Sequence, residues 1–387
     1  MARGVRALVE PVMLQWGRRT AGLSIEIAAK KAKVKPEQLA SWEAGNDYPT
    51  IAQMERLAEV YKRPLAVFYL PAPPRDFMVM KDFRRLPQKA AGPMSPQLTY
   101  AIRRAHERRE IALDLFEDLG SLPPVIDVRA SLDEAPSAVA KRIREYLGVT
   151  FDAQTQWRQP YDPFNNWRAR IEEKGILVFQ ANNVSLDEMR GFSISENRLP
   201  VIVVNTKDTP NGRTFTMLHE FCHLMLRLSG ICDLDDDSAR PPEEQRVEVF
   251  CNMVAGEVLV PMTHLLAHSI VQRHKGTNWT EEELSVIARD FGASREVVLR
   301  RLLIAERTTR AVYEQKRKEF AAEYETSRAA RREGFVPPAT KALSSLGKSF
   351  TRLVLQNYYQ DRISLRDVSD FLGVKVKHVS KIEEAAW

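Results

Sequence analysis

Two histidines four residues apart, with a glutamate beside the first, are the side chains of this 387-residue sequence best suited to chemistry. They are His219, Glu220 and His223, in the stretch TMLHEFCHLML at residues 216–226. Because a helix advances about 100° per residue, both imidazoles project from one side and reach the same metal ion. A carboxylate beside such an ion accepts a proton from water and returns it to a leaving amine. The spacing therefore predicts a zinc-dependent hydrolytic site with Glu220 as general base.

A catalytic zinc ion needs a third protein ligand, and the next helical stretch offers one. In VEVFCNMVAGEVLVP (247–261), Glu248 and Asn252 share one face, and small residues would allow this helix to approach the first closely. We expect Glu248 to complete the site, with Glu244, one turn earlier, as the alternative. The competing interpretation is that both histidines are ordinary core or capping residues.

The amino-terminal region has the outline of a helix-turn-helix. In AGLSIEIAAKKAKVKPEQLASWEAGNDYPT (21–50), apolar residues fit two short helices separated by a turn, and lysines surround that turn. Lys33 and Lys35 are the candidate phosphate contacts, while Gln38 and Ser41 on the second helix are the candidate readers of base edges. Protein docking and a purely structural role are the alternatives for this module.

The central motifs resemble a known family of enzymes. The segment RGFSISENRLPVIVVNTKDTPNGRTFTMLHEFCHLML, followed by VEVFCNMVAGEVLVP, is similar to the ImmA/IrrE family of zinc metallopeptidases over about residues 131–305. The resemblance implies a zincin-like fold in which zinc is bound by His219, His223 and Glu248. It also implies that Glu220 is the general base.

The same resemblance suggests how a substrate would bind. In peptidases of this general type, an extended substrate pairs with the edge of a sheet beside the metal. The strand PVIVVN is the candidate edge, with Val201, Val203 and Asn205 as substrate-contacting positions. An internal strand is an equally good interpretation of this run.

Residues 13–70 resemble the XRE (Cro/cI-like) helix-turn-helix family, including the stretch WEAG after the second helix. ImmA/IrrE peptidases, as a family, cleave helix-turn-helix repressors or related regulators. The two resemblances together imply a protein substrate of the repressor or antitoxin type, cut in response to stress, phage or mobile-element signals.

The rest of the chain fits a mainly α fold with a small β-sheet, an α+β class. GILVFQ and PVIVVN are the best strands, and helical patterns dominate elsewhere. The predicted domains are a five-helix helix-turn-helix domain (1–70), a linker and connecting helix (71–130), the metallopeptidase domain (131–305) and a helical C-terminal extension (306–387). The helix-turn-helix outline recurs faintly in ELSVIARDFGASREVVLRRL and in SLRDVSDFLGVKVKHVSKIE. Because chance produces such outlines easily, we assign a function to the first copy only.

Composition indicates an intracellular protein. The formal charge is +6, which suits a polyanion such as DNA without requiring one, and the three cysteines do not form a disulfide framework. No run approaches the about 18 apolar residues of a membrane span, so a soluble, cytoplasmic protein is expected.

The motifs together give two candidate functions. The protein is either a zinc endopeptidase fused to a helix-turn-helix module, or a DNA-binding regulator or antitoxin whose peptidase-like domain is sensory.

Overall fold

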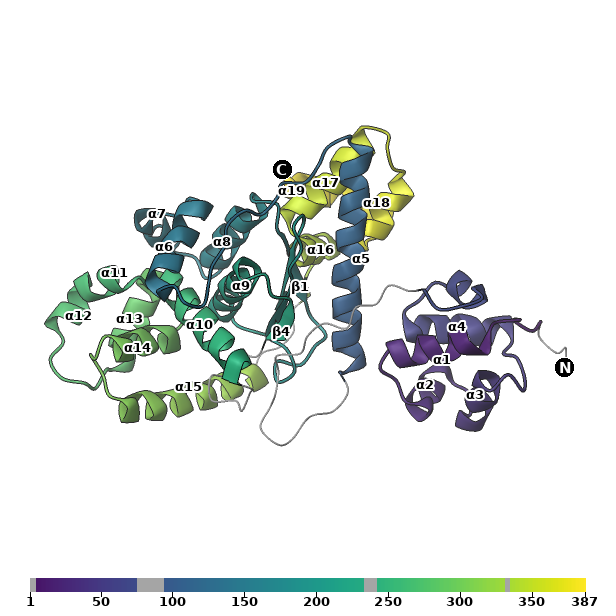
Figure 1. Cartoon of the computed structure of the whole chain (residues 1–387), viewed down its shortest axis with the longest axis horizontal. Helices are drawn as coiled ribbons and strands as arrows, with labels where there is room; N and C mark the ends of the chain where they lie inside the picture. Colours follow the sequence, from purple (N-terminus) through teal and green to yellow (C-terminus); the bar gives the residue numbers. More distant parts are fainter. Residues whose placement is uncertain (1–4, 75–93, 233–241, 331–334) are drawn as a thin grey trace. The chain divides into compact units, whose positions relative to one another are not determined.

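The computed structural model describes residues 5–74, 94–232, 242–330 and 335–387. They fall into two compact units, and the division lies within helix α5 (Pro96–Asp118), between Arg104 and Ala105. The fold is mainly helical with one small sheet, which confirms the predicted α+β class (Figure 1). None of the helices in the described ranges combines the length and apolar character that a membrane crossing requires. Residues 75–93 of the predicted linker lie outside the described residues.

The amino-terminal unit contains the predicted helix-turn-helix. Its helices are α1 (Pro11–Thr20), α2 (Ile25–Ala32), α3 (Pro36–Glu43), α4 (Ile51–Tyr61) and the 3-10 helix η1 (Leu65–Tyr69). Local side chains fix the helix starts: the Ser24 hydroxyl accepts a hydrogen bond from the Ile27 amide, and Thr50 and Gln53 form a capping box. Trp42 and Phe68 anchor the apolar core that the helices share.

The second unit is built around a four-stranded sheet of order β1-β3-β2-β4. Strand β1 (Leu177–Ala181) runs parallel to β3 (Val201–Asn205), whereas β2 (Gly191–Ile194) pairs antiparallel with both β3 and β4 (Gly230–Cys232). The prediction that β3 is an edge strand is wrong, because β3 has a hydrogen-bonded neighbour on each side. Val201, Val203 and Asn205 are buried accordingly.

Helix α9 (Pro210–Met225) packs against β2 and β3, and α8 (Asp162–Glu172) and α10 (Pro242–Leu259) pack against α9 (Figure 1). Leu218, Phe221 and Met225 of α9 belong to the apolar core of this unit. The remaining helices before the C-terminal region are α6 (Pro136–Leu147), α7 (Phe151–Thr155), α11 (Met262–Ala267), α12 (Ser269–Arg273), α13 (Glu281–Phe291), α14 (Arg295–Ile304) and α15 (Arg310–Ala330).

The C-terminal region is helical, as predicted, and packs on the sheet. It comprises α16 (Pro338–Leu346), α17 (Lys348–Tyr359), α18 (Leu365–Leu372), the 3-10 helix η2 (Val376–His378) and α19 (Val379–Ala386). Helix α16 lies against β1, where the Gln180 side-chain amide donates to the Ser344 carbonyl (2.7 Å) and the Ser345 hydroxyl donates to the Gln180 carbonyl (3.1 Å). These bonds fix the C-terminal region to the outer side of β1.

Candidate metal centre

Helix α9 carries the histidine motif, and its start is defined by local chemistry. Thr209 caps the helix through a hydrogen bond from the Gly212 amide, and Pro210 occupies the first turn, where its missing N–H is tolerated. Gly212 leaves room for the Asp208 carboxylate, which pairs with Arg190 at 2.9 Å. The helix is therefore held at its N-terminus before it enters the core.

His219 and His223 project from α9 toward Glu248 of α10. Their Nε2 atoms are 3.0 Å apart, and the Glu248 carboxylate oxygens lie 3.3 Å from Nε2 of His219 and 3.2 Å from Nε2 of His223. Tetrahedral zinc with bonds of about 2.0–2.1 Å places its ligand atoms about 3.3 Å apart. The three side chains thus have the mutual spacing of ligands around one small cation.

This cluster includes the first choice of third ligand, Glu248, and not the alternative, Glu244. Within the described ranges, no other set of three His, Cys, Asp or Glu side chains lies close enough together to hold a metal ion. Asn252, one turn after Glu248 on α10, lies close enough to His219 to oppose the lowering of its pKa by burial. The face shared by Glu248 and Asn252 in the sequence is the face that meets the histidines.

Burial and charge act against each other at the cluster. His219, His223, Glu220 and Glu248 are all 0% exposed. Burial lowers the pKa of His219, while at His223 the neighbouring Glu248 carboxylate outweighs burial and raises the pKa to about 9. Burial would raise the pKa of Glu248, but the charge of His223 outweighs it and the pKa falls. The buried Glu248 carboxylate therefore favours positive charge beside it, which a bound metal cation would supply.

Glu220 occupies a restricted space beside strand β2. A Cβ atom added to Gly191 would lie 3.0 Å from Oε1 of Glu220, 2.5 Å from Cγ2 of Thr216 and 3.0 Å from the Val203 carbonyl oxygen. Only a residue without a side chain fits between the strand and the helix there. Nothing in the sequence pattern pointed to Gly191, since its role depends on the pairing of β2 next to β3.

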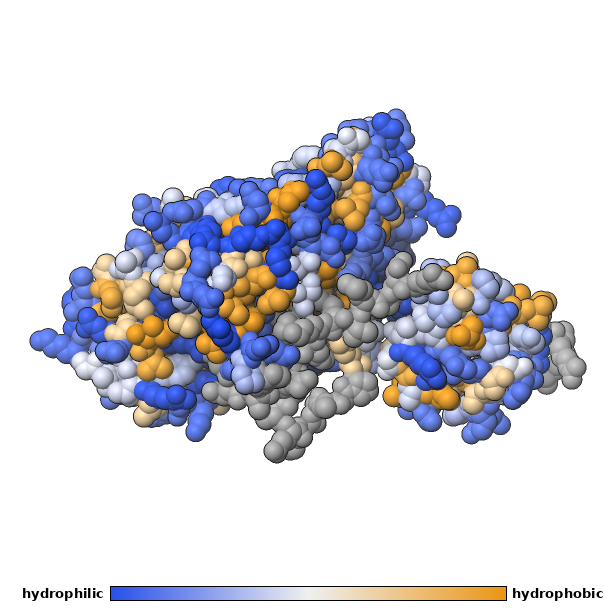
Figure 2. All heavy atoms as spheres, in the orientation of Figure 1, coloured by the Kyte–Doolittle hydropathy of each residue, from blue (hydrophilic) through white to orange (hydrophobic). Residues whose placement is uncertain are grey.

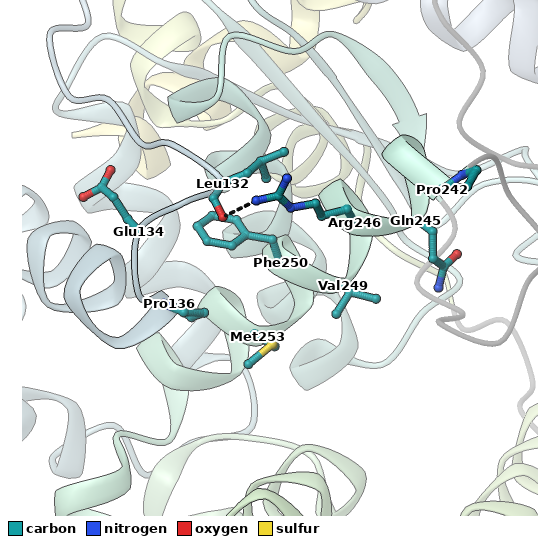
Figure 3. Close-up of a pocket in the computed structure, with 9 residues that line it drawn as sticks. All are labelled: Leu132, Glu134, Pro136, Pro242, Gln245, Arg246, Val249, Phe250 and Met253. Carbon is teal, nitrogen blue, oxygen red and sulfur yellow. Dashed lines mark hydrogen bonds between the residues drawn. The ribbon is translucent and has the colours of Figure 1, made fainter.

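A groove of about 570 Å³ lies along another face of α10 (Figure 3). Val249, Phe250 and Met253 line it, and they project about 100° or more around the helix axis from Glu248. The Arg246 guanidinium donates to the Leu132 carbonyl at its rim. Figure 2 shows hydrophobic residues gathered on the surface in the part of the view where α9 and α10 lie. The groove contains none of the three converging side chains.

The candidate DNA contacts lie around the turn between α2 and α3. Lys33 is exposed in a left-handed backbone conformation (φ 58°), and Lys35 is exposed at the N-cap of α3. Gln38 and Ser41 are half-buried on α3. The structure therefore places the two lysines at the surface, and the two polar residues on the helix that follows them.

Two family models match the chain. Residues 171–303 match peptidase family M78, described as an IrrE N-terminal-like domain, and residues 14–68 match a helix-turn-helix family. No curated protein matched the chain. The first match includes the whole of α9 and α10, and therefore the His219, His223 and Glu248 cluster. The second includes α2, α3 and the turn between them.

Proposed function

Because the chain joins a helix-turn-helix domain to an IrrE N-terminal-like peptidase domain, we propose that it is a zinc-dependent endopeptidase that cleaves a transcriptional repressor or antitoxin. One observation carries the proposal. The imidazoles of His219 and His223 and the carboxylate of Glu248 converge with ligand spacing, and Glu220 follows His219 directly on the same helix.

The donor set supports zinc as the metal. Two imidazole nitrogens and one carboxylate are a recurrent catalytic zinc set, which leaves a further coordination position open. His219, His223 and Glu248 would hold the ion. When bound, zinc lowers the pKa of a water molecule and polarises the scissile carbonyl.

Glu220 is the proposed proton carrier. Its carboxylate accepts a proton from the attacking water molecule and passes it to the nitrogen of the leaving amine, so that the peptide bond breaks with no net change in the enzyme. Gly191 leaves the space that this side chain occupies. Burial of Glu220 strengthens its electrostatic interaction with a proton, because the carboxylate is shielded from bulk solvent.

The free side of β4 is the proposed binding edge for an extended substrate. Strand β3 is internal and the outer side of β1 is covered by α16, whereas β4 pairs with β2 alone among the described strands. A substrate strand added there would use backbone hydrogen bonds for affinity and its side chains for selectivity. This assignment replaces Val201, Val203 and Asn205 as the candidate edge.

The helix-turn-helix domain supports DNA binding or recruitment of the target. Lys33 and Lys35 at the turn would contact phosphates, while Gln38 and Ser41 would face base edges. A repressor or antitoxin is the proposed substrate because such regulators share this fold with the amino-terminal unit. The signal would be stress, phage or a mobile element.

Cleavage is tested by comparing the unmodified protein with the Glu220→Gln variant against the regulator encoded next to its gene. We expect a discrete fragment from the unmodified protein, its loss on chelation and its return on adding zinc. The Glu220→Gln variant should retain metal and produce no fragment. Equal cleavage by both proteins would remove Glu220 from the proposed role.

Complete burial of the cluster favours a second candidate function. A metal held by residues that are 0% exposed is suited to sensing or structural support, and the domain would then regulate DNA binding and not cut. In that case chelation should change the affinity for DNA at constant salt in both the unmodified protein and the Glu220→Gln variant. Replacement of Lys33 and Lys35 should weaken DNA binding and its salt dependence in either function.

A further inference from the structure

The C-terminal helices α18 and α19 reproduce the helix-turn-helix of the amino-terminal unit in detail. Helices α2 and α18 each have 8 residues, and each begins at a serine N-cap, Ser24 or Ser364, whose hydroxyl accepts a hydrogen bond from the amide three residues later. Because their length and their capping agree, the first helices of the two motifs begin and end at equivalent positions.

The turn after the first helix is also the same in both copies. The residue after α2 is Lys33 (φ 58°, ψ 45°), and the residue after α18 is Gly373 (φ 64°, ψ 35°). Two residues further on, Lys35 (φ −78°, ψ 143°) and Lys375 (φ −69°, ψ 144°) are extended N-caps of the next helical segment. Matching dihedral angles at both positions give the two turns the same path.

The second helices bury equivalent positions. Leu39 and Trp42 of α3 are buried in the first copy, and Val379 and Ile382, at the same distance from the N-cap lysine, are buried in the second. Helix α17 packs against both α18 and α19, whereas in the first copy α1 packs against α3 and α4 packs against α2. Helices α16 and α17 therefore hold the second motif in place.

The second motif exposes three lysines, although residues 364–387 carry four basic and four acidic side chains in all. Lys375, Lys377 and Lys381 are exposed, and none of them makes an ion pair with another described residue. Lys377 and Lys381 stand where the first copy has Glu37 and Ser41. The C-terminal copy thus presents more positive charge at the start of its second helix than the copy that matches the family model.

We propose that residues 364–387 form a second duplex-DNA-binding surface, with the segment from Val376 to Ala386 entering the major groove. Lys377 and Lys381 contact phosphates or guanine edges, and Lys375 contacts a phosphate beside the turn. Local charge favours this partner over a protein, because the exposed lysines at the turn, in η2 and on the first turn of α19 match a polyanion. The proposal goes beyond the peptidase function and does not depend on it.

The test measures binding of the full chain to a labelled mixed-sequence duplex of about 30 base pairs over a range of salt concentrations. The Lys377→Glu/Lys381→Glu variant changes the proposed surface. The Lys341→Glu/Lys348→Glu variant is the matched control, because it makes the same charge change at exposed lysines of α16 and α17. Both are made with and without Lys33→Glu/Lys35→Glu, so that the amino-terminal contribution is measured separately.

We expect the Lys377→Glu/Lys381→Glu variant to lose about tenfold or more in affinity and about two units of salt slope, one for each lost phosphate contact. The loss should persist when the amino-terminal lysines are replaced. The control should change affinity much less. Circular dichroism checks folding, and Lys377→Gln/Lys381→Gln repeats the test without added repulsion.

Three results would overturn the proposal: affinity equal to that of the control, an unchanged salt slope, or equal binding to single-stranded DNA of the same length. The last result would mean general attraction of a polyanion and not groove binding. None of these results bears on metal-dependent cleavage. The DNA-binding experiment therefore tests the second DNA surface independently of the peptidase function.

Discussion

Gly191 on strand β2 faces Glu220 on helix α9 so closely that a Cβ atom on the glycine would lie 3.0 Å from the carboxylate oxygen. The same Cβ would lie 2.5 Å from the Thr216 side chain, a separation that forces something to move. Gly191 is not in a left-handed conformation, so the requirement comes from space and not from backbone angle. The strand and the motif helix therefore constrain each other at the proposed general base.

The Gly191→Ala variant should lose about a hundredfold in kcat/KM for cleavage and retain bound metal, because the methyl group displaces Glu220 but not the imidazoles. Gly256→Ala on α10 is the matched control, since its Cβ would meet only Arg301 Cδ at 3.5 Å. Cleavage rates and metal content of both variants check the prediction. Unchanged cleavage by Gly191→Ala would show that the helix yields without moving the carboxylate.

Replacing Glu248 with glutamine should abolish tight metal binding, since a neutral amide replaces the only carboxylate in the cluster. We expect metal content to fall from about one zinc ion per chain to nearly none. Glu244→Gln, one turn earlier on the same helix, is the control and should retain the metal. Metal analysis after dialysis measures both, and the reverse result would assign the third ligand to Glu244.

The ion pair between Arg18 and Glu43 should stabilise the amino-terminal unit. The guanidinium nitrogens lie 2.7 and 2.8 Å from the two carboxylate oxygens, with side chains 13% and 6% exposed. Glu43→Gln leaves a nearly buried guanidinium without its counter-charge and should cost about 3 kcal/mol in the free energy of unfolding of this unit. Amide hydrogen exchange of α3 (Pro36–Glu43) measures the loss, and the exposed Glu55→Gln should cost almost nothing.

His106 on α5 should make the chain less stable in acid. Burial, assisted by the nearby Arg109 charge, lowers the pKa of His106 in the folded protein. The unfolded chain therefore binds the proton more readily, and stability falls as pH drops from the ordinary histidine pKa through the lowered one. His106→Gln should reduce this decline. Urea midpoints of both proteins at about pH 7.5 and 5.5 check it, and an equal decline in both would exclude His106 as the cause.

The metal cluster was predictable because it depends on the spacing of residues within each of two helices. The separation of His219 and His223 places both on one side of any helix, and Glu248 lies on the face of the next helix that carries Asn252. Packing one helix on the other then brings the three side chains together. The turn between α2 and α3 was predictable for the same reason, since the apolar residues of the two short helices and the lysines around the turn lie close together in the sequence.

The sheet was not predictable to the same extent, because strand order depends on partners far apart in the sequence. The run of five β-branched and polar residues in β3 predicts a strand but not which neighbours it pairs with. Strand β2 has four residues and β4 has three, too short to show an alternating pattern. The edge assignment and the role of Gly191 both required that order.

Attachment of α16 to β1 has a consequence for the behaviour of shortened chains. Removal of residues 331–387 would take α16 from the outer edge of β1 (Leu177–Ala181), and an exposed strand edge of this apolar composition recruits copies of itself. Such a fragment should precipitate or self-associate even with its histidine cluster intact. The C-terminal helices therefore also keep the protein from associating with itself.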